Sequence, residues 1–261
     1  MNRLDKEMVV RGLVETRTKA QELISNGVVK VNGKVQTKSS FNVGSFDQIE
    51  ILENDVLKYV SRGGLKLEKA LKVFNVEVEN KIVMDIGSST GGFTDCALKS
   101  GAKKVVAVDV GTNVMHKTLR ENPNVELHEN TNIKDLNQDK FLNVDLIVVD
   151  VSFVSLETIV EKVASENFVG DMICLIKPQF ECGKQIATKC GGVIKSKTVH
   201  KDVLSKVIKF FNKNNFYLLG LDFSPIKGGD GNIEYVSHFS NQADKNLSFE
   251  IEKIVNVAFN Q

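Results

Sequence analysis

The chain has 261 residues, enough for one large domain or for two. Its hydrophobic content of 42%, its charged content of 26% and its formal net charge of +1 are ordinary for a soluble globular protein and exclude a polycation. No apolar run approaches the ~20 residues that span a bilayer, and the charged first residues are unlike a signal peptide, so we expect a cytoplasmic protein.

The first 56 residues predict a small α+β domain. Helices are expected over residues 3–12 and 16–26, where apolar side chains recur at helical spacing. A β-hairpin follows, because alternating valines flank Asn32-Gly33, a dipeptide that strongly favours a two-residue turn. A further strand over residues 47–52 completes this unit.

The first 40 residues of this unit carry an excess of positive charge. Residues 1–40 hold eight Lys and Arg against four Asp and Glu. This surplus favours contact with a polyanion such as RNA, although charge alone is equally compatible with a solvated surface. The cations expected at such a polyanion are Arg3, Lys6, Arg11, Arg17, Lys19 and Lys30 of this unit, with Arg62 just beyond it.

From residue 81 onward, short apolar runs alternate with helical stretches. The runs end in Asp, Gly or Pro and read KIVMDIG, KKVVAVDVG, NVELHE, VDLIVVDVS, DMICLIKP and FYLLGLDFS. Near-continuous apolar strands that alternate with helices predict an α/β fold with a parallel sheet covered on both faces. Such sheets bind ligands beyond the carboxyl ends of their strands, so we expect the site where the Asp and Gly residues lie.

A glycine-rich loop follows the first of these strands. VMDIGSSTGGFTD reads as a buried strand that ends at Asp85, a loop from Gly87 to Gly92, and a helix. Glycines let the backbone turn tightly and approach a ligand at the amino end of the helix. A dinucleotide-binding loop has the spacing G-x-G-x-x-G, whereas this one has G-x-x-x-G-G with an acid two residues upstream. That acid repels a pyrophosphate and attracts an ammonium group, which favours a ligand with an amino-acid part over NAD.

The next strand closes with a second acid, Asp109. In nucleotide-binding folds an acid at this place accepts hydrogen bonds from ribose hydroxyls. An amino acid and a ribose together indicate S-adenosylmethionine. The alternative is a glycine-rich turn that binds no ligand, but strand, loop, helix and second acid all occur in the expected order.

Charged side chains also mark later strand ends. LIVVDVSF places Asp150 after an apolar run, and ICLIKPQFE places Lys177 before Pro178, which cannot continue a sheet ladder. Glu234 begins a late strand after the loop from Gly228 to Gly231. Each of these residues alone could be a solvated strand cap, but together they suggest a catalytic group on neighbouring strands.

These residues resemble those of a known family. Asp150, Lys177 and Glu234, preceded by Lys66 in SRGGLKL, resemble the Lys-Asp-Lys-Glu tetrad of FtsJ-like ribose 2′-O-methyltransferases. Residues 3–33 look like an S4 RNA-binding domain. The pair of domains is the architecture of the TlyA (haemolysin A-like) family of rRNA methyltransferases. The resemblance covers nearly the whole chain and is carried by SRGGLKL, DIGSSTGGFTD, IKPQFE and GNIEY.

The resemblance implies a Rossmann-like methyltransferase fold, with a mostly parallel seven-stranded sheet and helices on both faces. A small α+β S4-type domain would occupy residues 1–56, a linker residues 57–65 and the methyltransferase domain residues 66–261. Arg62-Gly63-Gly64 would let the backbone turn, so that Lys66 reaches the active site from the linker.

The resemblance also implies the site residues. Lys177 would be the base, Asp150 would hold it and steer the ribose hydroxyl, and Glu234 would fix Lys66. The residues expected at S-adenosylmethionine are Asp85, Gly87, Ser88, Ser89, Gly91, Gly92, Phe93, Asp109, Val110, Asn132, Ile133 and Asp150. The expected substrate is a cytidine of ribosomal RNA, with the large-subunit RNA favoured over the small-subunit RNA, and the expected protein is a monomer without a metal ion.

Three other functions compete with this one. A membrane-active haemolysin is disfavoured, because no segment spans a bilayer and no helix joins a large apolar face to a basic one. An RNA-binding module with an inactive methyltransferase domain is disfavoured by the complete tetrad. A methyltransferase for a protein or a small molecule would leave the basic first unit unexplained. The four cysteines include no Cys-x-x-Cys pair, so we expect buried thiols rather than disulfides or zinc.

Overall fold

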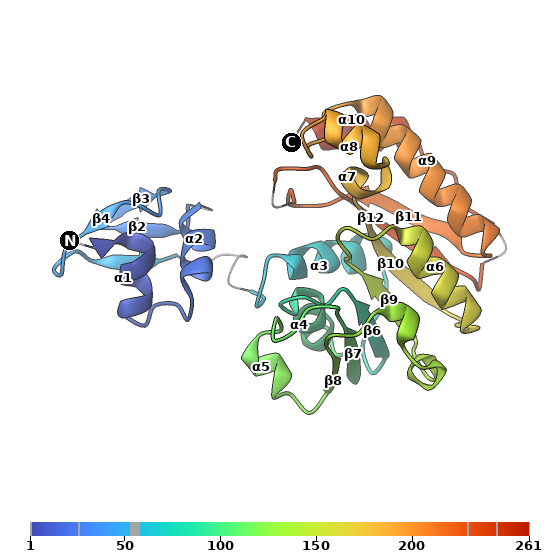
Figure 1. The fold of residues 1–261 in the computed structure, drawn as a ribbon, viewed down its shortest axis with the longest axis horizontal. Helices are drawn as coiled ribbons and strands as arrows, with labels where there is room; N and C mark the ends of the chain where they lie inside the picture. The colour runs from blue at the N-terminus through green and yellow to red at the C-terminus, as the bar shows by residue number, and fades with distance from the viewer. Residues whose placement is uncertain (1, 26, 53–57, 229, 244, 261) are drawn as a thin grey trace. The chain divides into compact units, whose positions relative to one another are not determined.

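A computed structural model gives the fold of the chain and describes residues 2–25, 27–52, 58–228, 230–243 and 245–260 (Figure 1). The chain divides into two compact units, Met1–Lys58 and Tyr59–Gln261. The end of the expected first domain, residues 53–56, and the first linker residue, 57, lie outside the described residues. The expected linker residues 63–65 form the first turn of a helix that starts at Gly63, so the predicted linker was too long.

The first unit combines two helices with short strands. Its elements are β1 (Asn2–Arg3), α1 (Leu4–Val10), α2 (Arg17–Ser25), β2 (Val29–Val31), β3 (Lys34–Gln36), β4 (Asn42–Val43) and β5 (Ile49–Ile51). The two helices, the hairpin and the strand over 47–52 are confirmed, whereas the pairing of β1 with β4 was not expected. The strands β3, β2 and β5 form an antiparallel sheet in that order. Leu4, Met8, Leu23 and Ile24 of the helices pack on its inner valines.

The turn of the hairpin has the geometry that its sequence predicts. Asn32 and Gly33 both have positive φ, 50° and 76°. A two-residue type I′ turn needs positive φ at both central positions, which Asn and Gly adopt most easily. The dipeptide therefore sets the register of β2 against β3, with Val31 opposite Lys34.

The second unit alternates strands and helices. Its first elements are α3 (Gly63–Phe74), β6 (Ile82–Ile86), α4 (Gly92–Lys99), β7 (Lys104–Val108), α5 (Lys117–Arg120), β8 (Val125–His128), η2 (Ile133–Asp135), η3 (Gln138–Phe141) and β9 (Leu146–Val149). Then come α6 (Leu156–Ser165), β10 (Asp171–Ile176), α7 (Pro178–Glu181), α8 (Lys184–Lys189), α9 (Lys197–Lys213), β11 (Tyr217–Phe223), β12 (Tyr235–Ser240) and α10 (Ile251–Phe259).

These strands form one seven-stranded sheet in the order β11-β12-β10-β9-β6-β7-β8. The strands from β10 to β8 run parallel, whereas β12 pairs antiparallel with both β10 and β11. The expected mostly parallel, seven-stranded α/β sheet is therefore confirmed. Asp85, which was expected to end its strand, lies one residue before the end of β6.

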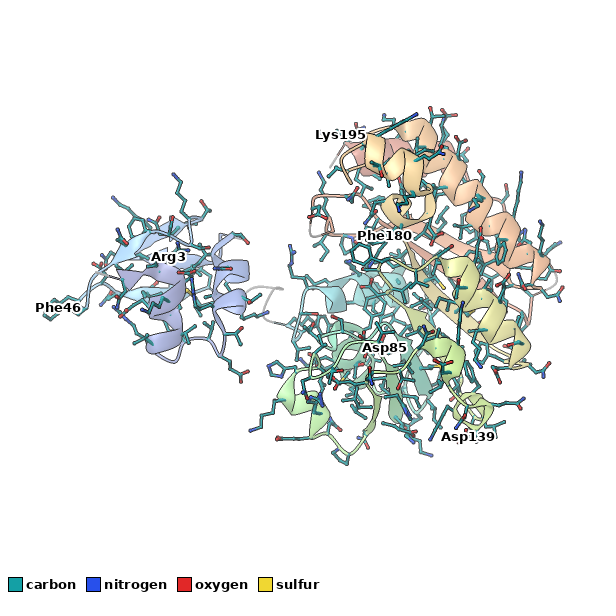
Figure 2. All side chains as sticks on the ribbon, viewed as in Figure 1. Arg3, Phe46, Asp85, Asp139, Phe180 and Lys195 are labelled. Carbon is teal, nitrogen blue, oxygen red and sulfur yellow. The ribbon has the colours of Figure 1, made fainter. Side chains whose placement is uncertain are left out.

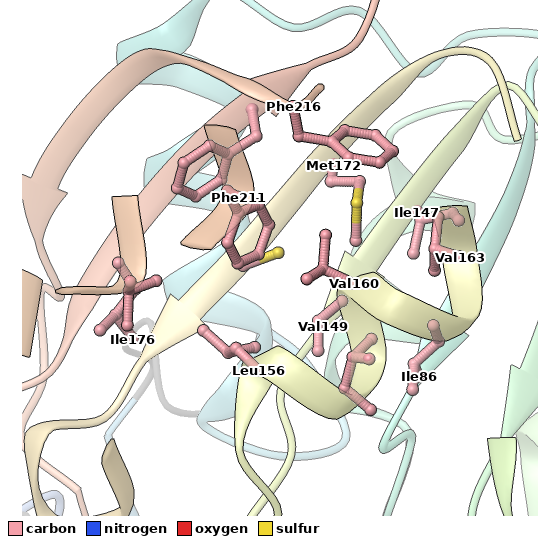
Figure 3. Packing of buried hydrophobic residues seen from close by; sticks show 14 of the residues in the cluster. Ile86, Ile147, Val149, Leu156, Val160, Val163, Met172, Ile176, Phe211 and Phe216 are labelled. Carbon is pink, nitrogen blue, oxygen red and sulfur yellow. The ribbon is translucent and has the colours of Figure 1, made fainter. Parts of the chain in front are cut away.

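Helices cover both faces of the sheet (Figure 1). Successive strand residues point to opposite faces. On β6, Met84 and Ile86 face the core beneath α6, α9 and α10, whereas Val83 faces the core beneath α3 and α4. Figure 3 shows the first of these cores, where Val160 of α6 packs among the side chains of β9 and β10.

The order of the strands creates a crevice at their carboxyl ends. From β6 the chain continues to β7 and β8 on one side and later to β9 and β10 on the other, so the order reverses beside β6. Ligands bind at such a reversal. There Asp150 N donates to Ile86 O at 3.1 Å, and a Cβ at Gly87 would lie 2.7 Å from Asp150 O. The segments that follow β6 and β9 thus meet so closely that only glycine fits at position 87.

Candidate active site

Four charged side chains from four elements meet beside this crevice. Lys66 lies on α3, Asp150 directly follows β9, Lys177 follows β10, and Glu234 precedes β12. Lys177 Nζ lies 2.5 Å from Asp150 Oδ1, and Lys66 Nζ lies 3.9 Å from Asp150 Oδ2. Lys66 Nζ also donates to Glu234 Oε2 at 2.6 Å. The structure therefore brings together all four residues of the predicted tetrad, and Lys66 reaches the group from a helix rather than from a linker.

Burial makes this pairing necessary. Lys66, Lys177 and Glu234 are only 8%, 7% and 3% exposed. A charge withdrawn from water is costly unless an opposite charge and hydrogen bonds replace its hydration. The Asp150 carboxylate lies between the two ammonium groups, and Lys177 also donates to Ser152 Oγ at 3.1 Å. The result is a chain of alternating charges that fixes the direction in which each side chain points.

The glycine-rich loop before β12 leaves room for Glu234, the last residue in this row of charges. A Cβ at Gly228 would lie 2.6 Å from Glu234 Oε1, so a larger residue at 228 would displace the carboxylate. The same oxygen accepts from Gln179 Nε2 at 3.3 Å. Gln179 and Ser152 were missed from the sequence, although each lies only two residues from a predicted catalytic residue, which is the signal that could have identified them.

A cavity of about 570 Å³ opens next to the tetrad. It has Asp150 in its wall, and the predicted cofactor residues that line it are Gly87, Ser89, Asp109, Val110, Asn132 and Ile133. Phe153 also lines it and was not predicted; its ring is 89% exposed and its φ is +64°, which a residue with a bulky side chain rarely adopts. Phe153 packs against Phe180 with ring centroids 4.8 Å apart.

The acid at the end of β7 is held by backbone groups. Asp109 Oδ2 accepts from Ser89 N at 2.8 Å, and Oδ1 accepts from Gly111 N at 2.7 Å. Each carboxylate oxygen has a second lone pair, so this half-buried group can still accept from a diol. The apolar side chains of Val110 and Ile133 line the cavity nearby. An acid beside apolar walls is the surface that a ribose joined to a flat ring requires.

Asp85 does not line the cavity. It is fully buried, and its Oδ2 accepts from Thr94 Oγ1 at 2.6 Å. Burial raises the pKa of this carboxyl to about 7, against the lowering effect of Thr94. Its Oδ1, like the Oγ of the buried Ser88, has no hydrogen-bond partner within the described part of the chain. These polar atoms lie at the cofactor loop, so the loop fits a ligand that brings donors of its own.

Three other predicted cofactor residues serve helix packing instead of lining the cavity. A Cβ at Gly91 would lie 2.3 Å from Leu119 Cδ1, and one at Gly92 would lie 2.9 Å from Gly64 N. Glycine at these positions allows α5 and α3 to approach the start of α4. Phe93 is 4% exposed and belongs to the core between α3, α4 and the sheet.

The predicted RNA-binding cations of the first unit differ in their surroundings. Arg3 and Arg17 pair with the buried Asp5 at 3.0 and 2.9 Å, yet their side chains remain 48% and 55% exposed. The pKa of the Asp5 carboxyl lies well below its usual range, chiefly because the Arg3 side chain donates hydrogen bonds to it. Lys6 is exposed, whereas Lys19 and Lys30 are half-buried. Arg62, also half-buried, belongs to the second unit and precedes α3.

Arg11 has a structural task. Its Nε donates to Glu7 at 2.9 Å, and its two terminal nitrogens donate to the carbonyl oxygens of Asp47 and Gly44 at 2.5 and 2.7 Å. The side chain is 24% exposed. Its guanidinium is therefore directed at the protein's own backbone, away from the RNA-binding role that its charge suggested.

The described residues contain no cluster of His, Cys, Asp and Glu able to hold a metal ion. Nor does any helix among them have the length and apolarity to cross a bilayer. All four cysteines are free; Cys96 and Cys174 are buried as expected, but Cys190 is exposed.

Comparisons with known proteins agree with this geometry. The FtsJ-like methyltransferase model matches residues 59–241, and the S4 domain model matches residues 2–49. Hemolysin A of Brachyspira hyodysenteriae is 44% identical over 91% of this chain and 99% of its own. The 16S/23S rRNA (cytidine-2′-O)-methyltransferase TlyA of Mycobacterium tuberculosis is 36% identical over 94% of this chain and 92% of that protein. A solved structure from Streptococcus thermophilus, with hemolysin in its name, has a TM-score of 0.78 and 38% identity over 99% of this chain and 96% of that one.

Proposed function

This chain belongs to the TlyA (haemolysin A-like) family, an FtsJ-like methyltransferase domain joined to an S4 domain, and we propose that it methylates ribosomal RNA at the 2′-hydroxyl of a cytidine. The observation that carries the proposal is the pairing of Lys177 with Asp150, 2.5 Å apart, at the wall of the cavity. A lysine and a carboxylate at one place can bind a hydroxyl group, and the lysine nitrogen can receive its proton when the lysine is neutral.

We assign S-adenosylmethionine to the cavity. Asp109 would accept from the ribose hydroxyls, Val110 and Ile133 would contact the adenine, and the backbone at Gly87 leaves room for the amino-acid part. When bound, S-adenosylmethionine supplies the methyl group. The protein's contribution is to place the acceptor oxygen in line with the bond that breaks, since positioning lowers the barrier of a displacement reaction.

Each tetrad residue has a separate role in the proposal. In its neutral form, Lys177 Nζ accepts the proton of the 2′-hydroxyl as the oxygen attacks. Asp150, 2.5 Å from Lys177 Nζ, keeps that nitrogen turned toward the hydroxyl. Lys66 adds positive charge that stabilises the developing oxyanion, and Glu234 holds Lys66 in place at 2.6 Å. Because these groups are nearly enclosed, their charges act through little water.

RNA as the substrate class is supported at both units. The exposed ring of Phe153 at the cavity offers a face on which the base of the reacting nucleotide can stack. In the first unit, Arg3, Lys6 and Arg17 remain exposed and can contact phosphates. The Mycobacterium relative acts on both 16S and 23S rRNA by its name. For this chain we propose the large-subunit RNA as the preferred substrate and the small-subunit RNA as the less favoured one. Either substrate would place the protein in the cytoplasm.

The nature of the methylated product tests the proposal. Ribosomal subunits that lack the modification are incubated with the protein and S-adenosylmethionine, and their RNA is digested to nucleosides and separated. We expect 2′-O-methylcytidine. A base-methylated nucleoside would contradict the proposed chemistry. A methyl group found only on ribosomal protein would contradict the substrate class. Cofactor binding without any transfer would indicate an RNA-binding module whose methyltransferase domain is inactive.

A further inference from the structure

A phenylalanine of the first unit projects fully into water. Phe46 lies in the turn between β4 and β5, and its side chain is 98% exposed (Figure 2). A single exposed apolar residue is common on protein surfaces and needs no special explanation. What distinguishes Phe46 is the set of contacts that holds its turn.

Two side chains from elsewhere in the unit fix this turn. Arg11 of the first helical segment donates to Gly44 O at 2.7 Å and to Asp47 O at 2.5 Å, on the two sides of Phe46. Asn32 of the hairpin turn donates to Asp47 Oδ1 at 2.8 Å, and Asp47 Oδ2 accepts from Gly44 N at 2.7 Å. Arg11 is itself held by Glu7 at 2.9 Å. The backbone of the turn is therefore ordered before a partner binds, and the ring of Phe46 projects from it.

A ring presented in this way suits one kind of partner. A turn whose backbone is already ordered loses little conformational entropy on binding, and an aromatic ring adds few torsions to restrict. Unpaired bases of structured RNA stack on such rings. Residues 1–40 of the unit have a surplus of cations, and the exposed Lys34 follows the adjoining hairpin turn. We propose that Phe46 stacks on an unpaired base of the ribosomal RNA that the first unit binds.

This inference rests on the proposed function for the identity of the RNA. It goes beyond that function because it assigns a contact to a residue of the first unit, outside the tetrad and independent of charge. The competing partner is an apolar patch of a ribosomal protein. A protein patch requires only apolar area at position 46, whereas a base requires a flat ring.

Three variants of the full chain separate these partners: Phe46→Ala, Phe46→Leu and Phe46→Trp. Binding to purified ribosomal subunits that lack the methyl group is measured by co-sedimentation. We expect Phe46→Ala and Phe46→Leu to bind about tenfold more weakly and Phe46→Trp to bind as the wild type does. Binding by Phe46→Ala at wild-type strength would overturn the proposal, and so would full binding by Phe46→Leu. Because Phe46 makes no part of a core, all three variants should unfold at the wild-type temperature.

Salt dependence gives a second, independent readout. Stacking releases no counterions, so the slope of log K against log salt should be the same for Phe46→Ala as for the wild type. The control is Lys6→Ala, which removes an exposed cation and should make the slope shallower. A shallower slope for Phe46→Ala would mean that the substitution acts through lost phosphate contacts, against the proposal.

Fluorescence reports the contact directly. The chain contains no tryptophan, so Phe46→Trp introduces its sole indole. We expect its emission to be quenched when the ribosomal subunit binds, because a stacked base quenches indole. Unchanged or blue-shifted emission at saturation would overturn the proposal. Combining Phe46→Trp with Lys177→Ala should abolish methyl transfer and leave binding and quenching intact, so failure of the proposed function and failure of this contact have different signatures.

Discussion

Lys66 and Glu234 are 168 positions apart in the chain, yet Lys66 Nζ and Glu234 Oε2 lie 2.6 Å apart in a nearly dry environment. This ion pair connects the helix that opens the second unit to the strand that is inserted between β10 and β11. The pair therefore joins elements that folding must bring together before the tetrad exists.

Removing one partner of this pair should cost stability. Glu234→Ala leaves Lys66 with a buried charge, and we expect the free energy of unfolding to fall by about 3 kcal/mol. Replacing both partners, as Lys66→Met with Glu234→Leu, should recover most of that loss while methyl transfer stays abolished. Urea unfolding and a transfer assay on the same three proteins check this. A double variant as unstable as Glu234→Ala would contradict the pairing argument.

The role of Lys177 is tested by Lys177→Arg. Arginine keeps the positive charge near Asp150 but cannot accept a proton at any usable pH. If Lys177 removes the proton of the hydroxyl, single-turnover transfer should slow by about 100-fold or more, with cofactor binding unchanged. Single-turnover rates measured from about pH 6 to about pH 10 decide the point. A variant that reacts at the wild-type rate would show that Lys177 supplies only charge and position.

The buried Asp85 should make stability depend on pH. Its pKa of about 7 in the folded protein exceeds its ordinary value of 3.8, so between these values the folded state holds a proton that the unfolded state has released. The free energy of unfolding should therefore fall as the pH rises from about 4 to about 7, and level off above that. Asp85→Asn, which keeps an oxygen for Thr94, should lose this dependence. Urea unfolding at pH 5, 6, 7 and 8 tests it, and equal pH slopes for both proteins would contradict it.

Glu129 joins two loops next to the proposed cofactor cavity, although it does not line the cavity itself. Its carboxylate accepts from the backbone N–H groups of Asn113, Val114 and Met115 at 2.8, 3.0 and 3.3 Å, and it pairs with Arg120. These contacts tie the loop after Asp109 to the segment before Asn132. We expect Glu129→Gln to weaken cofactor binding about tenfold, since these backbone donors lose a charged acceptor that holds the loop after Asp109.

Isothermal titration with S-adenosylmethionine measures this effect. The matched control is Glu126→Gln on β8, which removes a carboxylate that is bound to Lys104 and Lys140 and not to the loop after Asp109. Binding to ribosomal subunits should be unchanged in both variants. Equal affinities for the cofactor in the two variants would show that Glu129 serves folding alone.

Sequence patterns predicted those structural elements that depend mainly on residues close together in the chain. The Asn32-Gly33 turn and the apolar strands of the sheet depend on neighbouring residues, and both were found as expected. The tetrad was also predicted, because each member follows or precedes a strand, or falls in a specific motif. The insertion of β12 between β10 and β11 was not, since apolar periodicity carries no information on strand order.

The sequence carried no sign of a structural task that depends on a distant partner. Arg11 was counted as an RNA-binding cation, but its backbone partners lie 33 and 36 positions away in the chain. Gly92 was counted as a cofactor residue, but its lack of a side chain serves the approach of α3 to α4. In each case the residue type suits both tasks, and only the tertiary fold distinguishes them.

Transfer of a tritiated methyl group from S-adenosylmethionine to purified, unmodified ribosomal subunits tests the central claim most directly, with the wild type beside Lys177→Ala. We expect label in the large-subunit RNA with the wild type and none with the variant, although both bind the cofactor. Label in both subunits would agree with an rRNA methyltransferase but would contradict the preference for the large-subunit RNA. No label in any RNA from a wild-type protein that binds the cofactor would contradict the claim that this chain is an rRNA methyltransferase.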